Sequence, residues 1–232
     1  MLEIACFSIK DCLVAQKSGA DRIEFCMNQK LGGISPSKKR IREARSKIKG
    51  QLFLMIRPRG GNFIYSKGEI KEMKNLIRFA KKLKYDGVVF GVLQKNRKVD
   101  FKVCQKLVKL ANPLDCTFHK AFDYSKDLFE SLKDCISCGF DNILSSGGTE
   151  SVVNGMFILK HLVKKAKKRI TIIPAGGVRA NNMPDIRHVT KSKVYHSSAI
   201  NPKTGKISGL EIIRMKRLAS SGAIIRLTSG HR

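Results

Sequence analysis

Two acids and two histidines of this sequence stand at the ends of short apolar runs. Glu24 lies in RIEFC, His119 and Asp123 lie in TFHKAFD, and His196 closes KVYH. Imidazole and carboxylate side chains exchange protons near neutral pH, so we predict that these four residues form an acid–base site. A single histidine is more often a structural residue, and this alternative stays open for both histidines.

A pair of arginines adds a second kind of chemistry. Arg57 and Arg59 are separated by one proline and followed by Gly60 and Gly61. A guanidinium can bind a carboxylate or a phosphate through two parallel hydrogen bonds. We therefore predict that Arg57 and Arg59 bind an anion, and we count Arg57 among the catalytic candidates. Structural pairing of Arg57 with Glu24 is an equally weighted alternative.

Two glycine-rich turns and a lysine are further candidates for anion binding. The turns at residues 145–148 (SSGG) and 175–177 (AGG) each follow an apolar run. Glycine allows backbone N–H groups to approach an anion closely, and the N-terminus of a following helix adds a positive dipole. A plain tight turn is the simpler alternative. The predicted anion-binding residues here are Lys120, Ser146, Gly147, Gly176 and Gly177.

The chain has seven cysteines, and two of them end the first two apolar runs. Cys6 closes LEIAC and Cys26 closes RIEFC. Neighbouring strands lie about 4.8 Å apart, and two thiolates at that separation suit Cu(I), so Cys6 and Cys26 are predicted metal ligands. Side-chain alternation places Cys6 on the face opposite Glu3, whereas Cys26 shares a face with Glu24. The two thiols therefore meet only if the chain leaves its regular pleat at Cys6.

Alternating strands and helices are expected to position these residues. Period-two apolar runs predict strands, and the longer amphipathic stretches between them predict helices. The predicted strands are 2–6, 22–26, 51–57, 87–93, 114–119, 142–146, 170–175 and 193–196. The predicted helices lie near 8–18, 68–84, 100–110, 126–138, 150–168, 181–188 and within 210–219, and one more opens at Ser35-Pro36.

Eight such repeats in 232 residues predict an α/β protein with a single-domain (β/α)8 TIM barrel. In this fold the functional residues gather where the strands end, which is where the candidates above lie. A doubly wound open sheet is the alternative, but the first predicted strand is not followed by a glycine-rich phosphate turn. We expect residues 1–200 to form the barrel, and residues 201–232 to form a C-terminal helix and a basic tail that close it.

The composition excludes several classes of protein. No apolar run approaches the roughly 20 residues that cross a bilayer, and an acid at position 3 is atypical of a signal peptide. We therefore expect a soluble intracellular protein with no membrane partner and with free thiols.

The 46 Lys and Arg residues against 18 Asp and Glu residues give a net charge of +28. Most of the excess is lysine near predicted helix ends, which favours a solvated surface over nucleic-acid binding.

Several segments together resemble the CutC family of copper homeostasis proteins. The matching segments follow the family's order over about residues 1–200: LEIACFS, SGADRIEFC, LGGISPS, IRPRGGNFIYS, GVVFGVL, TFHKAFD, ILSSGG and HSSA. The resemblance implies a (β/α)8 barrel, a cytoplasmic location, a homodimer and Cu(I) binding through the residues that match Cys6 and Cys26. The family's shared residues at the strand ends match Glu24, Arg57, Arg59, His119, Asp123, Ser146, Gly147 and His196. Lys120 stands where arginine is also common, and the short basic end of the chain departs from the family's longer C-terminal segment.

Two functional interpretations follow from these patterns. The first is a cytoplasmic Cu(I)-binding protein of copper homeostasis. The alternative is a barrel enzyme with acid–base or hydrolytic chemistry on a small anionic metabolite such as a phosphorylated one. Two cysteines alone leave the arginines, histidines and acids without a role. A polyanion-binding surface is a minor third interpretation.

Overall fold

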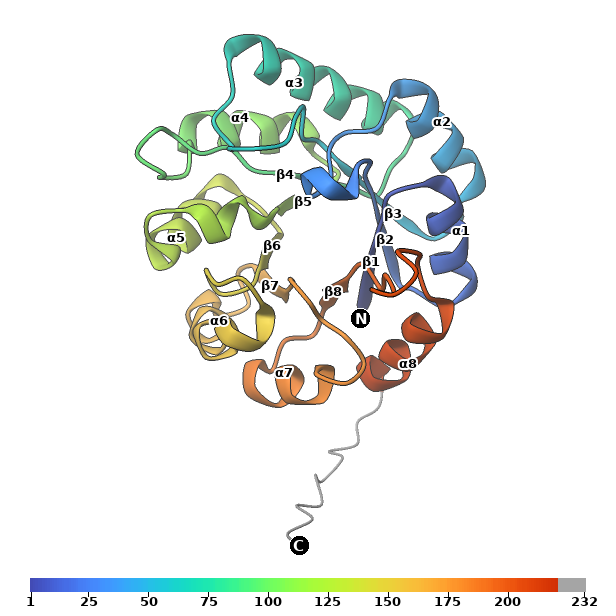
Figure 1. The fold of residues 1–232 in the computed structure, drawn as a ribbon. Helices are drawn as coiled ribbons and strands as arrows, with labels where there is room; N and C mark the ends of the chain where they lie inside the picture. Colours follow the sequence, from blue (N-terminus) through green and yellow to red (C-terminus); the bar gives the residue numbers. More distant parts are fainter. Residues whose placement is uncertain (221–232) are drawn as a thin grey trace, which may run out of the picture.

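The computed structural model describes residues 1–220, and it confirms the (β/α)8 barrel. Seen along the barrel axis in Figure 1, the helices surround a ring of parallel strands. The strands are β1 (Leu2–Cys6), β2 (Arg22–Phe25), β3 (Gln51–Met55), β4 (Gly87–Phe90), β5 (Asp115–Phe118), β6 (Asn142–Ser145), β7 (Thr171–Pro174) and β8 (Tyr195–Ser197). Each of them overlaps a predicted strand.

The helices also follow the predicted order. They are α1 (Ile9–Lys17), α2 (Lys38–Lys47), α3 (Lys67–Lys82), α4 (Phe101–Ala111), α5 (Leu128–Cys138), α6 (Val152–Ala166), α7 (Met183–Thr190) and α8 (Gly209–Ser220). The start predicted for α2 at Ser35-Pro36 is wrong, because Ser37 is the N-cap and its side chain accepts a hydrogen bond from the Arg40 N–H. Two 3-10 helices were not predicted: η1 (Gln29–Leu31) and η2 (Lys120–Tyr124).

The strands pair in the order β7-β6-β5-β4-β3-β2-β1-β8. The strands at the two ends of this order, β7 and β8, are connected through the Ser197 side chain. Its hydroxyl donates to the Val178 carbonyl in the loop after β7 at 2.7 Å, and Arg179 Nη1 of the same loop lies 3.5 Å from Ser197 Oγ. These contacts bring the loop after β7 and the end of β8 together. The carboxyl ends of the strands therefore meet around one mouth.

Side-chain alternation divides the interior into two parts. Apolar side chains on one face of each strand, such as Ile4, Leu54 and Phe118, join the helices in a large outer core. The opposite faces point into the barrel, where a smaller apolar cluster includes Cys26, Phe53, Met55, Val89, Leu144, Ile173 and Ala175. The buried charged groups Glu3, Arg22 and Glu24 alternate with residues of the outer core along β1 and β2, so they point into the lumen.

Helix ends are fixed by local caps that the sequence provides. Ser66 and Glu69 form a reciprocal capping box at the start of α3. Asp127 accepts hydrogen bonds from the N–H groups of Phe129 and Glu130 at the start of α5. Gly139 ends α5 with a φ of 90°, a left-handed conformation that glycine adopts without strain. Such caps fix the residues at which these helices begin or end.

Helix α8 completes the ring between α7 and α1 (Figure 1). Ile212 and Met215 are fully buried, and Glu211 accepts a hydrogen bond from the Ala180 N–H at 2.8 Å. The remainder of the predicted basic tail, residues 221–232, lies outside the described residues, so its predicted role in closing the barrel stays a prediction. The boundary predicted at residue 200 also stays a prediction.

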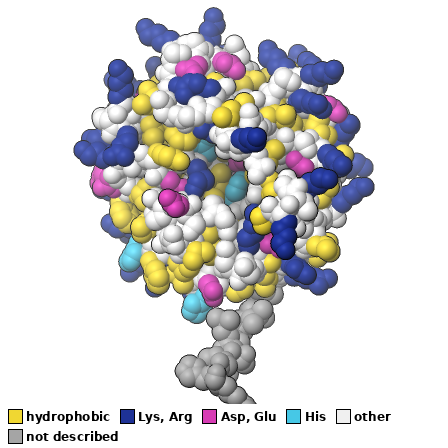
Figure 2. Space-filling view, in the orientation of Figure 1, with side chains coloured by type: hydrophobic (Ala, Val, Ile, Leu, Met, Phe, Trp, Pro, Cys, Tyr) yellow, Lys and Arg dark blue, Asp and Glu magenta, His cyan; other side chains and the backbone are white. Residues whose placement is uncertain are grey.

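The basic side chains are dispersed over the visible surface. Figure 2 shows lysines and arginines scattered around the face of the barrel mouth, with acids and apolar groups between them. This distribution agrees with a solvated surface on this face. Within residues 1–220, no helix has the length and apolar character needed to span a membrane.

Candidate functional site

A cavity of about 840 Å³ opens at the mouth of the barrel, and its entrance is the hollow near the centre of Figure 2. This volume is in the range of pockets that bind small molecules. Of the predicted site residues, those that line it are Glu24, Cys26, Arg57, His119, Lys120, Gly176, Gly177 and His196. Those that do not line it are Cys6, Arg59, Asp123, Ser146 and Gly147. The predicted set therefore divides into pocket residues and residues that support them.

Glu24 is the buried acid of this pocket. Strand β2 directs its side chain into the lumen, on the same face as Cys26 two residues later, and the residue is only 3% exposed. Its Oε2 atom has no hydrogen-bond partner within residues 1–220. Burial raises the pKa of Glu24 to about 7. An acid in this state can hold or release a proton inside the pocket.

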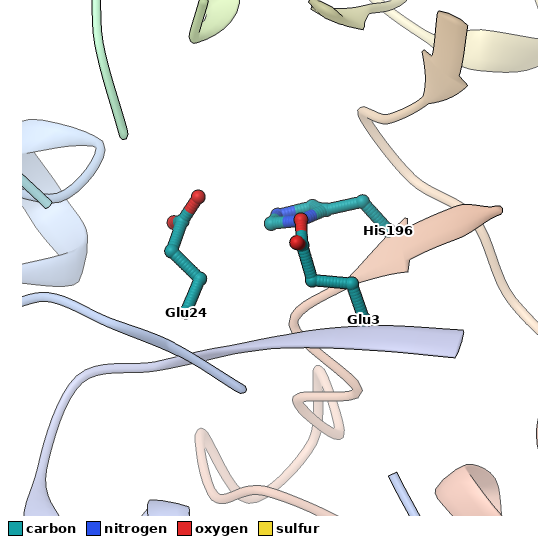
Figure 3. A group of neighbouring side chains, drawn as sticks. All are labelled: Glu3, Glu24 and His196. Carbon is teal, nitrogen blue, oxygen red and sulfur yellow. The ribbon is translucent and has the colours of Figure 1, made fainter. Parts of the chain in front are cut away.

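His196 and Glu3 form a pair beside Glu24. His196 Nδ1 lies 2.6 Å from Glu3 Oε1, and Arg22 forms an ion pair with the other oxygen of Glu3. Figure 3 shows the His196 ring directed towards Glu24, with the Glu3 carboxyl group beside the ring. Burial disfavours the charge on His196, but the hydrogen bond to Glu3 and the nearby Glu24 outweigh it and raise its pKa. Although burial opposes its charge too, Arg22 and His196 lower the pKa of Glu3.

His119 lies across the pocket in a different state. It caps η2, where its Nδ1 accepts a hydrogen bond from the Ala121 N–H at 3.2 Å, and its ring packs on Phe63. A Cβ atom on Gly91 would lie 2.8 Å from Nδ1, so a glycine is needed beside this ring. Burial, together with the charge of Arg57, lowers the pKa of His119 to about 3. His119 is therefore a neutral imidazole at physiological pH, with Nε2–H as its remaining donor.

This neutral state predicts how stability depends on pH. Below pH 6.5 the unfolded chain protonates His119 while the folded chain does not, so the free energy of unfolding falls as the pH decreases. Between pH 6 and 4, we expect His119→Gln to remove about 1.4 kcal/mol per pH unit from the slope of stability against pH. Urea unfolding of both proteins at several pH values measures the slopes, and equal slopes would contradict the prediction.

Arg57 holds loops together rather than pairing with Glu24. Its guanidinium donates to the carbonyl oxygens of Leu31 (2.7 Å), Gly33 (3.0 Å) and Gly61 (3.1 Å) and lies 4.8 Å from the centre of the Phe63 ring. These bonds join the loop after β2 to the loop after β3. Arg57 lines the pocket and is 5% exposed, so it also provides positive charge there.

Arg59 belongs to the same loop but lies outside the pocket lining. Its Nε donates to Glu69 at 2.6 Å, and its Nη2 donates to the Ile64 carbonyl at 2.7 Å. The first bond ties the loop after β3 to the start of α3, and the second holds the loop itself together. The structure thus gives Arg59 local partners that compete with the anion-binding role predicted from the sequence.

Asp123 occupies the turn that was predicted to bind an external anion. Its carboxylate accepts hydrogen bonds from the Ser145 hydroxyl (2.5 Å) and from the N–H groups of Ser146 and Gly148 (both 2.9 Å). The Gly147 N–H donates instead to Ser145 Oγ at 2.8 Å. The chain therefore supplies its own anion to the turn after β6, and Asp123 supports this loop from outside the pocket lining.

Lys120 and the second glycine turn do face the pocket. Lys120 Nζ lies 2.7 Å from Ser146 Oγ and 2.9 Å from the Asp123 carboxylate, which fix it in place. A Cβ atom on Gly176 would lie 3.1 Å from Lys120 Nζ, so the ammonium group sits against this turn. A Cβ atom on Gly177 would meet nothing within 4 Å, so this glycine borders open space in the pocket.

The two candidate copper ligands lie on opposite faces of the sheet. Cys26 belongs to the lumen cluster and lines the pocket, whereas Cys6 belongs to the outer core beside Cys12. Burial raises the pKa of both the Cys6 and Cys26 thiols. Strand β1 therefore keeps its regular side-chain alternation up to Cys6. With this alternation, the two thiols point to opposite faces and do not share one site. All seven cysteines are free and buried.

Some residues of the site were not predicted from the sequence. Glu3 and Arg22 do not line the cavity, but they complete the charged group in the lumen beside Glu24. The sequence marks them only as charged residues within apolar strands. The loops add an apolar wall and further cations at the entrance. These additional lining residues include Phe7, Lys30, Phe63, Ile64, Leu93 and Arg97.

Comparison with known proteins identifies related chains. The model of the CutC family matches residues 1–201. The human copper homeostasis protein cutC homolog is 37% identical over 199 residues, which cover 86% of this chain and 73% of the human protein. A CutC family protein of Parabacteroides distasonis is 40% identical over 202 residues, covering 86% of this chain and 82% of that protein.

Solved structures agree with this relationship. The crystal structure of CutC from Streptococcus agalactiae has a TM-score of 0.81 at 32% identity and covers 85% of this chain and 98% of that one. Phosphoribosylanthranilate isomerase from Thermotoga maritima has a TM-score of 0.61 at 14% identity, covering 94% of this chain and 97% of that one. The second likeness shows the barrel fold alone.

Proposed function

This chain belongs to the CutC family of copper homeostasis proteins, and from that premise we propose that its functional site is the pocket at the barrel mouth. We infer that the pocket binds a small anionic metabolite and transfers a proton to or from it. One observation carries this proposal: Oε2 of Glu24 is buried, has no hydrogen-bond partner among residues 1–220, and belongs to a side chain that lines an 840 Å³ cavity together with Lys30, Arg97 and Lys120.

The entrance supports an anionic ligand. Lys30, Arg97 and Lys120 line the cavity, and Lys120 is held against the Gly176 turn. A cleft with one sign of charge raises the local concentration of oppositely charged molecules. Between this entrance and Glu24, the wall is largely apolar. The ligand we expect is therefore a small molecule with an apolar or ring-containing body and a carboxylate or phosphate group at one end.

The inner end supports proton transfer. Glu24 would accept a proton from the ligand or donate one to it through a carboxyl oxygen. His196, held by Glu3 through Nδ1, would present Nε2 to the same part of the ligand. His119 would donate a hydrogen bond from Nε2 as a neutral group. Burial excludes bulk water from this region, which strengthens each of these interactions.

A metabolite screen tests the proposal. Melting temperatures of the wild-type protein are measured with a library of anionic metabolites, and a hit is expected to stabilise the fold in a concentration-dependent way. Lys120→Met is expected to weaken the binding of that hit at least tenfold. A matched control, Lys133→Met, removes an exposed lysine that pairs with Glu130 on α5 and should leave binding unchanged. A library without a single stabilising anion would count decisively against the proposal.

Cu(I) as a bound cargo is a second candidate, favoured by the soft donors of the pocket. Cys26 and Met55 both line the cavity and both lie within 4 Å of the position of a Cβ atom on Gly33. Thiolate and thioether sulfur are ligands that Cu(I) prefers. We propose that Cys26 provides the main ligand, and that Cys6 joins it only when the end of β1 leaves its pleat.

This arrangement predicts unequal effects of the two cysteines. Cys26→Ser is expected to weaken Cu(I) binding at least tenfold, whereas Cys6→Ser is expected to change it less than threefold. Competition with a Cu(I) chelator under reducing conditions measures both affinities. Equal losses in the two variants would show that both thiols bind the metal together, and retained binding in the double variant would exclude this site.

A homodimer and a cytoplasmic location accompany the copper proposal. Both rest on the family resemblance. Light scattering of the purified chain tests the dimer, and fractionation of cells that express it tests the location.

A further inference from the structure

We propose that Glu24 and His196 form a site for a borderline divalent cation of the Zn²⁺ type, with Glu3 orienting His196. One ligand atom from each of the three side chains lies within 4.8 Å of the others (Figure 3). The inference concerns the inner end of the same pocket, but it stands whether or not a metabolite is converted there.

The charges around the lumen leave one acid without a partner. Glu3 is neutralised by its ion pair with Arg22, and its other oxygen is bonded to His196. Glu24 is also buried, at 3% exposure, and its Oε2 has no hydrogen-bond or ion-pair partner within residues 1–220. A buried carboxylate requires a proton, a ligand or a cation to offset the loss of water. A metal ion at this position would meet that requirement.

His196 is held in the orientation that suits a metal ligand. When Nδ1–H donates to Glu3 at 2.6 Å, the lone pair is on Nε2, and this nitrogen is the one that can bind a metal. Histidine ligands of metals commonly donate their other N–H to a carboxylate, which fixes both the tautomer and the ring. Glu3 would fix the ring through Nδ1, and Glu24 would bind the metal together with Nε2 on the other side of the ring.

The spacing requires only a small adjustment. Bonds of about 2.0–2.2 Å place two tetrahedral ligands of Zn²⁺ about 3.4 Å apart. The three donor atoms lie within 4.8 Å of one another, at most about 1.4 Å wider than this spacing. Rotation of the Glu24 side chain towards His196 can close the gap. Two protein ligands leave two tetrahedral positions for water or for a ligand in the pocket; catalytic zinc sites also keep an open position, although they commonly have three protein ligands.

The donor types separate this site from the copper proposal. Carboxylate oxygen and imidazole nitrogen suit borderline and harder divalent ions, whereas Cu(I) prefers sulfur. The thiol of Cys26 lines the same cavity, so the experiment must distinguish oxygen and nitrogen ligands from sulfur.

Isothermal titration of the metal-free, full-length protein with Zn²⁺ tests the proposal. We expect one equivalent to bind, Glu24→Gln and His196→Gln each to weaken that binding at least tenfold, and Glu3→Gln to weaken it by about 10–100-fold through loss of orientation. Circular dichroism establishes that each variant is folded. The double variant Cys6→Ser/Cys26→Ser is the control and should bind Zn²⁺ as the wild type does.

Co²⁺ provides a second readout that needs no variant. Bound to Glu24 and His196, it should show visible d–d bands without the sulfur-to-metal charge-transfer absorption that thiolate ligands produce. Wild-type protein that binds no Zn²⁺, binding that survives in both Glu24→Gln and His196→Gln, or a thiolate spectrum that disappears in the cysteine variant would overturn the proposal. None of these results depends on the metabolite screen, so the two proposals can fail separately.

Discussion

Replacing Asp123 with alanine is expected to lower the free energy of unfolding by about 3–5 kcal/mol, because each buried donor left without an acceptor costs about 1–3 kcal/mol. The Asp123 carboxylate is buried and satisfies the Ser145 hydroxyl and the N–H groups of Ser146 and Gly148. The variant would leave these donors unsatisfied and would remove the carboxylate that pairs with Lys120. Urea unfolding at neutral pH measures the loss.

A matched substitution separates charge from shape at this position. Asp123→Asn keeps the size of the side chain and one oxygen acceptor, so we expect an intermediate loss of about 1–3 kcal/mol. Because Lys120 loses its ion pair in both variants and keeps only Ser146 Oγ as a full partner, ligand binding at the pocket entrance should weaken as well. A loss below about 1 kcal/mol in Asp123→Ala would mean that the turn after β6 does not depend on this carboxylate.

Replacing Glu24 with glutamine is expected to act in the opposite direction on stability. Burial raises the pKa of Glu24 from 4.5 to about 7, so at pH 8 the folded state holds a carboxylate that the unfolded state solvates better. The variant should therefore gain about 3 kcal/mol at pH 8. Between pH 7 and 4.5 the wild-type acid is protonated when folded and ionised when unfolded, so the gain should shrink as the pH falls and disappear below pH 4.5.

Glu24→Gln should also lower the affinity of the protein for its metabolite. Glu24→Gln keeps the shape of the side chain but cannot accept a proton, so the metabolite that stabilises the wild type should bind at least tenfold more weakly. Stability measured in the presence of a chelator excludes a contribution from bound metal. A variant that is less stable than the wild type at pH 8 would show that Glu24 has a structural role instead.

The barrel and the position of its mouth were predictable from local pattern. Alternation over residues 22–26 placed Glu24 on the lumen face, and the predicted ends of the fifth and eighth strands placed His119, Lys120 and His196 at the pocket. The same alternation separated Cys6 from Cys26, and the structure has them on opposite faces. The alternation of side chains along a strand depends only on residues that are neighbours in the sequence, so it can be predicted from the sequence alone.

Partners between distant loops could not be predicted in this way. Arg57 donates to the Leu31 and Gly33 carbonyls, and backbone oxygens give no sequence signal because every residue has one. The turn at residues 145–148 has the composition of an anion site, but whether Asp123 or a ligand fills it depends on how η2 packs. Glu3 meets His196 only because β1 and β8 become neighbours when the barrel closes.

A crystal structure of the chain with the metabolite found by the screen tests the central claim most directly. We expect the anionic group of the metabolite beside Lys120 and the Gly176 turn. A second polar group should lie about 2.6–3.2 Å from the Glu24 carboxyl group, the range in which a proton can be transferred. A metabolite bound outside the barrel mouth, or bound there with Glu24 still without a partner, would contradict the claim.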